Sequence, residues 1–364
     1  MKSRLLLFIL AGALVARAQT AAPASATATP AVASTPAVTP VPDDYTPGYP
    51  GKRETIEATT KAGILGLRAT DIPRYTQTGP LPNPAPARHG VIAPFPRDPK
   101  LPTIWTIGDS TVRTGVNGSG EDQVGQWGWG APFVGYFDNY KVNVVNRAVG
   151  GTTSRSFYLA QWKAMVDLIK KGDVVILQFG TNSGGGELRG IGDDTQEATD
   201  RSGQPVTNHT FGWYLRQFIA ETRAKGATPI ICSLIPRNRR DANGKTVRDA
   251  ATQAGWAKQV AAAEGAGFID LNELVSRKYD TMDKATVDTL FDGSPHTSWT
   301  GAVVNAETVI SGLKALKNDP VAAYYVDQVK LIAPAPDLSV PASDAAKTDV
   351  PAATPAASTS ATAK

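Results

Sequence analysis

The stretch TIWTIGDST, residues 103–111, sets the expectation for the fold of this 364-residue chain. Its first six residues are mostly apolar and end at a glycine, which predicts a buried strand over 103–108. Ser110 follows two residues later. A serine just after a strand is more often a turn residue or a helix cap than a nucleophile, so its role depends on what the rest of the chain places beside it.

The same alternation of apolar strand and helix continues over about residues 101–317. Further strands are predicted at 142–149, 173–180, 228–235 and 267–271, and helices at 129–140, 156–172, 210–226, 250–265 and 300–316. Residues 181–208 read as a long polar loop. Strands that are apolar throughout and alternate with helices predict an α/β fold whose parallel sheet is covered on both faces.

The N-terminus has the pattern of a secretory signal peptide over residues 1–18. Lys2 and Arg4 precede an apolar run over 5–15, and the small-residue site Ala16-Arg17-Ala18 follows. The run is too short for a permanent membrane anchor. We expect cleavage near Ala18 and a secreted or periplasmic protein.

Two segments that flank the α/β region, residues 19–46 and 333–364, consist almost wholly of Ala, Thr, Pro, Ser and Val. They bury too little to offset chain entropy, so we expect disordered linkers. Residues 47–100 form a Pro-rich lead-in to which we assign no element, and 318–332 form a C-terminal extension. The net charge of +4 is spread along the chain and favours neither nucleic acid nor a membrane surface as a partner.

Glycines and polar residues follow three of the predicted strands: Gly108-Asp109-Ser110, Gly150-Gly151 and Gly180-Thr181-Asn182. In open α/β sheets, ligands bind beyond the carboxyl ends of the strands. A reacting serine needs donors for the oxyanion that forms after its attack. The backbone N–H groups of Ser110 and Gly151 and the side-chain amide of Asn182 are the candidates.

A serine nucleophile also needs a base, and the chain has three histidines, His89, His209 and His296. His89 lies in the lead-in, and His209 opens a helix, where it serves as a cap or a pocket residue. His296 lies just before the last helix, and Asp292 precedes it by four residues. We therefore favour His296 as the base, with Asp292 orienting it. No His/Cys cluster has zinc-ligand spacing, so we expect no metal.

The segments GDST, NRAVGGTTSRSF, FGTNS and HTSWTGA resemble, in order, the blocks of the SGNH hydrolase superfamily. With GWGAPF and HTFGWYLRQFI, they are most similar to the rhamnogalacturonan acetylesterases. The resemblance implies a flavodoxin-like three-layer α/β/α sandwich and the removal of acetyl groups from pectic polysaccharide without a cofactor. It also implies Ser110 as nucleophile, Gly151 and Asn182 in the oxyanion hole, and His296 as base.

One residue departs from that family's pattern, which places Asp three residues before His. Gly293 occupies this position, and Asp292 is one residue further away. A bulge over 293–295 would restore the geometry. The alternatives are a backbone carbonyl or another acid, such as Asp288.

Substrate contacts are predicted for Trp129, His209, Arg155 and Trp299, because aromatic faces suit sugar rings and cations attract acidic polymers. Core packing is the alternative for each tryptophan. Two other functions stay open: a different esterase on this fold, acting on acetylxylan or a lipid, and a carbohydrate-binding protein with a decayed site. The oligomeric state is not readable from the sequence.

Overall fold

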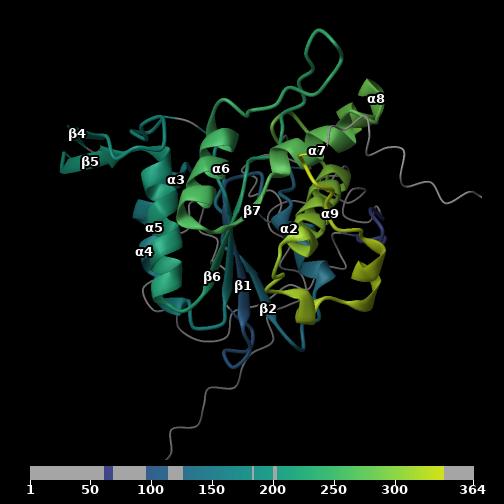
Figure 1. The fold of residues 1–364 in the computed structure, drawn as a ribbon, viewed down its shortest axis with the longest axis horizontal. Helices are drawn as coiled ribbons and strands as arrows, with labels where there is room; N and C mark the ends of the chain where they lie inside the picture. Colours follow the sequence, from purple (N-terminus) through teal and green to yellow (C-terminus); the bar gives the residue numbers. More distant parts are fainter. Residues whose placement is uncertain (1–60, 69–95, 114–125, 183, 200–202, 340–364) are drawn as a thin grey trace, which may run out of the picture. The chain divides into compact units, whose positions relative to one another are not determined.

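A computed structural model of the chain describes residues 61–68, 96–113, 126–182, 184–199 and 203–339. The predicted signal peptide, the linker over 19–46, most of the lead-in and most of the tail lie outside these residues. The central feature is a sheet of five parallel strands, shown in Figure 1. They are β1 (Thr103–Gly108), β2 (Asn143–Asn146), β3 (Val174–Gln178), β6 (Thr228–Cys232) and β7 (Gly267–Ile269). Their order is β2-β1-β3-β6-β7.

Helices cover both faces of this sheet (Figure 1). One face packs against α2 (Gly130–Phe133), α7 (Leu271–Tyr279) and α9 (Trp299–Ala315). The other packs against α3 (Ser154–Phe157), α4 (Lys163–Met165), α5 (Phe211–Ala224) and α6 (Gln253–Glu264). The short helix α8 (Lys284–Thr289) follows α7. The predicted three-layer fold with a central parallel sheet is confirmed.

Successive residues of each strand enter opposite cores, because side chains on a strand alternate between its two faces. Ile104 of β1 and Ile230 of β6 lie in the core under α9, whereas Trp105 and Ile231, the next residues along, lie in the core under α5. All four are at most 1% exposed. This two-sided burial is the reason that the strands are apolar throughout.

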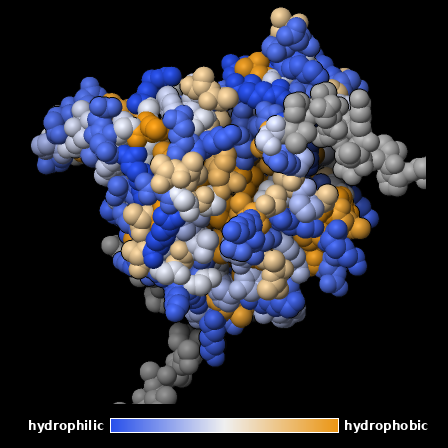
Figure 2. Space-filling model, viewed as in Figure 1, coloured by the Kyte–Doolittle hydropathy of each residue, from blue (hydrophilic) through white to orange (hydrophobic). Residues whose placement is uncertain are grey.

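The predicted long loop over 181–208 is wrong in part, because it contains an antiparallel hairpin. Its strands are β4 (Thr195–Thr199) and β5 (Pro205–His209). Nearly all β4 residues are exposed, so the hairpin lacks the apolar alternation by which a strand is recognised. Figure 2 shows this hairpin, at the left of the view, mostly in the blue of hydrophilic residues.

Two predicted helices are shorter or less regular than expected. The helix predicted over 129–140 consists of α2 and one 3-10 turn, η4 (Val134–Tyr136). It ends because Phe137 is extended and pairs with Tyr325 of the C-terminal extension. The helix predicted over 156–172 is interrupted by the π-helical segment η5 (Tyr158–Trp162) and closes in the 3-10 turn η6 (Val166–Leu168).

Two segments outside the sheet region lie against α9. Ala62 and Leu67 of the lead-in form an isolated bridge, and Ala62 packs in a cluster with Trp299. The C-terminal extension contains the 3-10 turns η7 (Ala322–Tyr324) and η8 (Asp327–Leu331). Beyond it, the Ala335 N–H donates to the Ser311 carbonyl, 2.8 Å away. Among the described residues, no helix is long and apolar enough to cross a membrane.

Candidate active site

The sheet order places the switch in winding direction between β1 and β3. Numbered along the chain, the five parallel strands have the order 2-1-3-4-5, for which ligands bind at the carboxyl ends of the first and third. Ser110 follows β1, Gly151 follows β2 and Asn182 follows β3. The Asn182 amide donates to the Thr152 carbonyl, 3.0 Å away, which joins the second and third of these loops.

Ser110 and His296, 186 residues apart in the chain, meet at this edge. The distance from His296 Nε2 to Ser110 Oγ is 3.0 Å. Burial lowers the pKa of His296, and the charges of Arg113 and Arg237 lower it further, whereas Asp292 opposes the shift. The imidazole is therefore neutral at neutral pH. In the tautomer with its proton on Nδ1, Nε2 can accept the proton of the serine hydroxyl.

A chain of buried side chains holds the turn that carries Ser110. The Asp109 carboxylate accepts from the backbone N–H and the hydroxyl of Thr111, at 2.9 and 2.8 Å. Gln178, the last residue of β3, donates to the Thr111 hydroxyl and accepts from the indole N–H of Trp129, 2.8 Å away. These buried hydrogen bonds fix the direction of the turn. Sequence analysis identified neither Thr111 nor Gln178 as part of it.

The loop before His296 turns tightly at Gly293, within the segment where a bulge was expected. Gly293 has φ +76°, in the left-handed region that glycine adopts most readily. The Asp292 N–H donates to the His296 carbonyl at 3.0 Å, and the His296 N–H donates to the Gly293 carbonyl at 2.9 Å. This tight loop keeps the Asp292 carboxylate close enough to raise the pKa of His296 by its charge.

The alternative acid, Asp288, has other partners. Its carboxylate accepts from the Asn238 amide at 2.9 Å and pairs with Lys284 at 2.5 Å. The geometry therefore favours Asp292 over Asp288 beside His296. The orienting role of Asp292 stays a prediction.

The predicted oxyanion donors follow the carboxyl ends of β1, β2 and β3. Gly151 has φ +75°, and within the described residues neither its N–H nor that of Ser110 donates to another protein group. The Asn182 amide uses one donor on Thr152 and retains a second. Three N–H donors are thus available at the ends of these strands, and their role in stabilising an oxyanion stays a prediction.

The prediction that Trp129 and Trp299 contact substrate is wrong. Trp129 is 0% exposed and Trp299 is 1% exposed. The Trp129 indole bonds Gln178, and the Trp299 indole N–H donates to the Leu67 carbonyl at 3.0 Å. Both rings are core residues, because an indole whose N–H finds an internal acceptor is stable inside the protein.

The other predicted substrate residues lie near the hairpin. His209, at the end of β5, stacks on Trp213 with ring centroids 3.8 Å apart. Arg155 donates to the Gly185 carbonyl at 2.9 Å, so its guanidinium holds the loop after β3. Their contact with substrate stays a prediction.

Trp127 is half-buried, and its backbone N–H donates to the carbonyl of Thr297, the residue after His296, at 2.8 Å.

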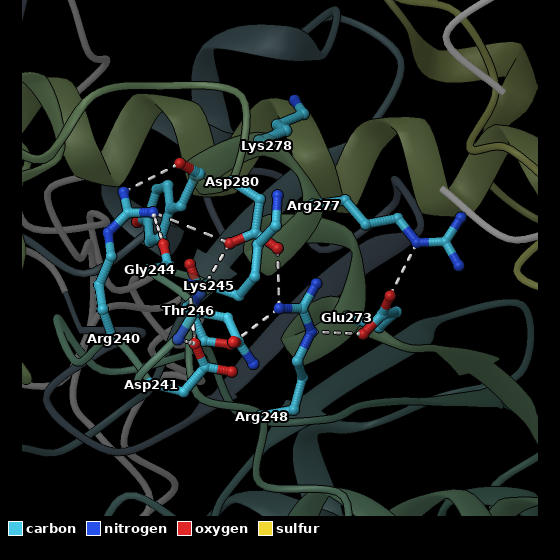
Figure 3. Close-up of polar contacts among 12 residues, drawn as sticks. Arg240, Asp241, Gly244, Lys245, Thr246, Arg248, Glu273, Arg277, Lys278 and Asp280 are labelled. Atoms are coloured by element: carbon cyan, nitrogen blue, oxygen red, sulfur yellow. Dashed lines mark hydrogen bonds and ion pairs between the residues drawn. The ribbon is translucent and has the colours of Figure 1, made fainter. Parts of the chain in front are cut away.

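The charges of two arginines, Arg113 and Arg237, act on His296. Sequence analysis did not identify Arg113. Arg237 donates to the Thr181 carbonyl at 2.7 Å. The loop that continues from Arg237 is fastened to α7 by ion pairs, shown in Figure 3. Arg248 bonds Glu273 at 3.0 Å and Asp280 at 2.8 Å, so this loop has a fixed position. Within the described residues, the side chain of Arg113 has no such partner.

The described residues contain no group of three or more His, Cys, Asp or Glu side chains that could hold a metal ion. The site consists of a hydroxyl, an imidazole, a carboxylate and N–H donors at the edge of a parallel sheet. These are the groups of an α/β hydrolase that acts through a serine.

Comparison with known proteins gives the family. Residues 106–302 match the GDSL-like Lipase/Acylhydrolase family, and the chain belongs to it. It is a carboxylic ester hydrolase with the SGNH fold. The chain is 31% identical over 220 residues to the "Probable rhamnogalacturonan acetylesterase YesY" of Bacillus subtilis, covering 58% of this chain and 93% of that protein. It is 26% identical over 221 residues to the "Rhamnogalacturonan acetylesterase" of Emericella nidulans, covering 58% and 84%.

A solved structure of a Bacillus subtilis protein is also similar. It has a TM-score of 0.48 and 26% identity, and the match covers 59% of this chain and 56% of that one. The chain thus spans about half the length of that protein.

Proposed function

We propose that this chain is an exported serine acetylesterase that removes acetyl groups from plant cell-wall polysaccharide, with rhamnogalacturonan as its substrate. The observation that carries the proposal is the 3.0 Å distance between Ser110 Oγ and His296 Nε2 at the carboxyl end of β1. The similarity to two proteins named as rhamnogalacturonan acetylesterases supports the acyl group and the polymer.

In the proposed reaction, the Ser110 hydroxyl attacks the acetyl carbonyl carbon while His296 Nε2 takes the hydroxyl proton. The carbonyl oxygen becomes an oxyanion, which the N–H groups of Ser110 and Gly151 and the Asn182 amide stabilise. The imidazolium then gives its proton to the sugar oxygen as the carbon–oxygen bond to the sugar breaks. Asp292 holds the imidazole in orientation and stabilises its positive charge.

The second half of the reaction repeats these steps with water. His296 takes a proton from water as the hydroxide attacks the acetyl-serine. The collapse of the second oxyanion breaks the bond to Ser110 Oγ, which regains the proton from His296. Acetate leaves, and the free enzyme is restored.

The test is acetate release from a panel of acetylated polysaccharides: rhamnogalacturonan, homogalacturonan and xylan. The proposal expects the highest kcat/KM on rhamnogalacturonan. Ser110→Ala should lower kcat by about 10³–10⁶ on each. If the wild-type protein releases acetate fastest from xylan, the proposed polymer is wrong. If it releases none from any member of the panel, the acetylesterase proposal fails.

Export rests on the sequence pattern of residues 1–18, which lie outside the described residues. Mass spectrometry of the protein from its native host should give an N-terminus near residue 19. A mature protein that retains Met1 would contradict this part of the proposal.

A further inference from the structure

Arg113 has an unusual environment for an arginine at the candidate site. It lies three residues after Ser110, and its backbone N–H donates to the Asp109 carbonyl at 3.1 Å, which fixes it in the same turn. Its side chain is half-buried. Among the arginines that the structure describes, Arg113 alone has no side-chain hydrogen bond, ion pair or ring contact, and its Nε is buried without a partner.

The guanidinium of Arg113 lies beside the loop that carries Gly151, and its charge acts on His296. It is packed over Gly150, the residue before the predicted oxyanion donor Gly151. A Cβ at position 150 would lie 2.9 Å from Arg113 Nη1, so the glycine makes room for the cation. The charge of Arg113 also reaches His296, whose pKa it lowers. The cation therefore lies against the second strand-end loop, within electrostatic reach of the imidazole.

Among the described residues, no carboxylate is hydrogen-bonded to this cation. Asp109 attracts Arg113 through space, but the carboxylate of Asp109 is buried and bonds Thr111. Burial lowers the pKa of Arg113. A partly buried cation without a hydrogen-bonded partner is costly, and an anion or water that bonds it lowers this cost.

We infer that Arg113 binds the carboxylate of a uronosyl residue in the polysaccharide, so that the site selects acidic over neutral acetylated polymers. This inference rests on the proposed function and names the feature of the substrate that is recognised. A guanidinium forms two parallel charge-assisted hydrogen bonds with a carboxylate. A neutral sugar would leave it without a charged partner.

A second use of the same cation would be stabilisation of the oxyanion. Oxyanion stabilisation acts on every ester to the same degree, because it concerns the acetyl group alone. Carboxylate binding acts only on a charged sugar. The two roles are therefore separated by comparing substrates that differ in the sugar carboxylate and share the acetyl ester.

The experiment measures acetate release from an acetylated rhamnogalacturonan oligosaccharide and from the same oligosaccharide with its carboxylates methyl-esterified. The wild-type protein should prefer the charged form in kcat/KM. In Arg113→Gln, the ratio of charged to neutral kcat/KM should fall about ten- to a hundred-fold, mainly through KM. Arg113→Lys, which keeps the charge without the planar fork, should give an intermediate ratio.

Arg223→Gln is the matched control, because Arg223 lies on α5 and donates to the Gly265 carbonyl at 3.0 Å. It should keep the wild-type ratio. Thermal unfolding of each variant shows whether it folds. If Arg113→Gln fails to fold, competitive inhibition of wild-type 4-nitrophenyl acetate hydrolysis decides: the deacetylated charged oligosaccharide should inhibit about ten-fold more strongly than its methyl ester.

Three results would overturn the inference. They are equal wild-type rates on the two forms, an unchanged ratio in Arg113→Gln, and an equal loss on both forms, which indicates oxyanion stabilisation. Each presupposes that the wild-type protein releases acetate. A wild-type protein that releases acetate from neither form would instead refute the proposed function.

Discussion

Two regions of this molecule use half-buried arginines in opposite ways. In the network between the loop over 237–252 and α7, Arg240, Arg248 and Arg277 each pair with a carboxylate of α7 or of the residue that ends it, within 3.9 Å (Figure 3). In the turn after β1, Arg113 has the same half-buried position and no bonded partner within the part of the chain that the structure describes. The difference indicates that the network arginines stabilise the fold, whereas Arg113 is available to bind an anionic group of a ligand.

The two regions should therefore respond differently to the loss of a charge. Removing a charge from the network should lower stability and leave the reaction intact. Removing a charge from the serine corner, which we define as Ser110, Arg113, Asp292 and His296, should change the reaction and leave stability nearly intact.

Among the variants that remove a charge, the largest effect is expected for Asp292→Asn. The amide keeps the size of the side chain but loses the charge that supports the imidazolium, so kcat should fall about 10²–10⁴. Asp288→Asn is the control, because Asp288 is bonded to Asn238 and Lys284. Steady-state kinetics on 4-nitrophenyl acetate measures both. If Asp288→Asn lowers kcat as much as Asp292→Asn does, the assignment of Asp292 as the orienting acid is wrong.

An intermediate effect, on stability, is expected for Asp280→Asn. This carboxylate, 12% exposed, accepts from the Thr246 N–H at 2.7 Å and pairs with Arg248 at 2.8 Å. Its loss should lower the free energy of unfolding by about 1–3 kcal/mol. Denaturant unfolding measures this change, and kcat of the folded variant should stay close to wild type. A stable variant with a greatly reduced kcat would break the comparison between the two regions.

The smallest effect is expected in the pH dependence. His296 must be neutral to accept the serine proton, so kcat/KM falls as pH drops through the pKa of His296. That pKa lies below the ordinary 6.5, because burial and the charges of Arg113 and Arg237 outweigh Asp292. Arg113→Gln removes one of the two cations, which raises the pKa and moves the acidic limb to higher pH.

The control for this shift is Arg248→Gln, whose charge belongs to the network and should leave the limb unchanged. A limb that stays in place in Arg113→Gln, or moves to lower pH, would show that Arg113 is not electrostatically coupled to His296.

The fold could be predicted from the sequence, and so could Ser110 and His296 as candidate residues, because a local pattern marks each of them. Apolar segments such as 173–180 that alternate with helices predict the strands of a buried parallel sheet. The glycines that follow these strands mark the sheet edge at which ligands bind. The β4–β5 hairpin was missed because β4 is almost wholly exposed and the buried residue of β5, Asn208, is polar, so no apolar periodicity marks it. Trp129 and Trp299 were misassigned because their sequence neighbourhood shows that they are near the motifs but not on which side of the backbone they lie.

Arg113 was missed for a different reason. An arginine in a turn is ordinary in sequence, and what distinguishes this one is the absence of a partner, which depends on the whole surrounding structure. The same holds for Gln178, whose two bonds join Trp129 to Thr111 across the end of the sheet. Contacts between residues far apart in the chain leave no local pattern.

The most direct test of the central claim, that Ser110 is a nucleophile activated by His296, is labelling with a serine-directed phosphonate followed by intact-mass and peptide mass spectrometry. The account predicts one adduct per chain, located on Ser110, with loss of esterase activity in proportion to labelling and no adduct in Ser110→Ala. Full labelling of another residue with loss of activity, or undiminished activity in protein fully labelled at Ser110, would contradict it.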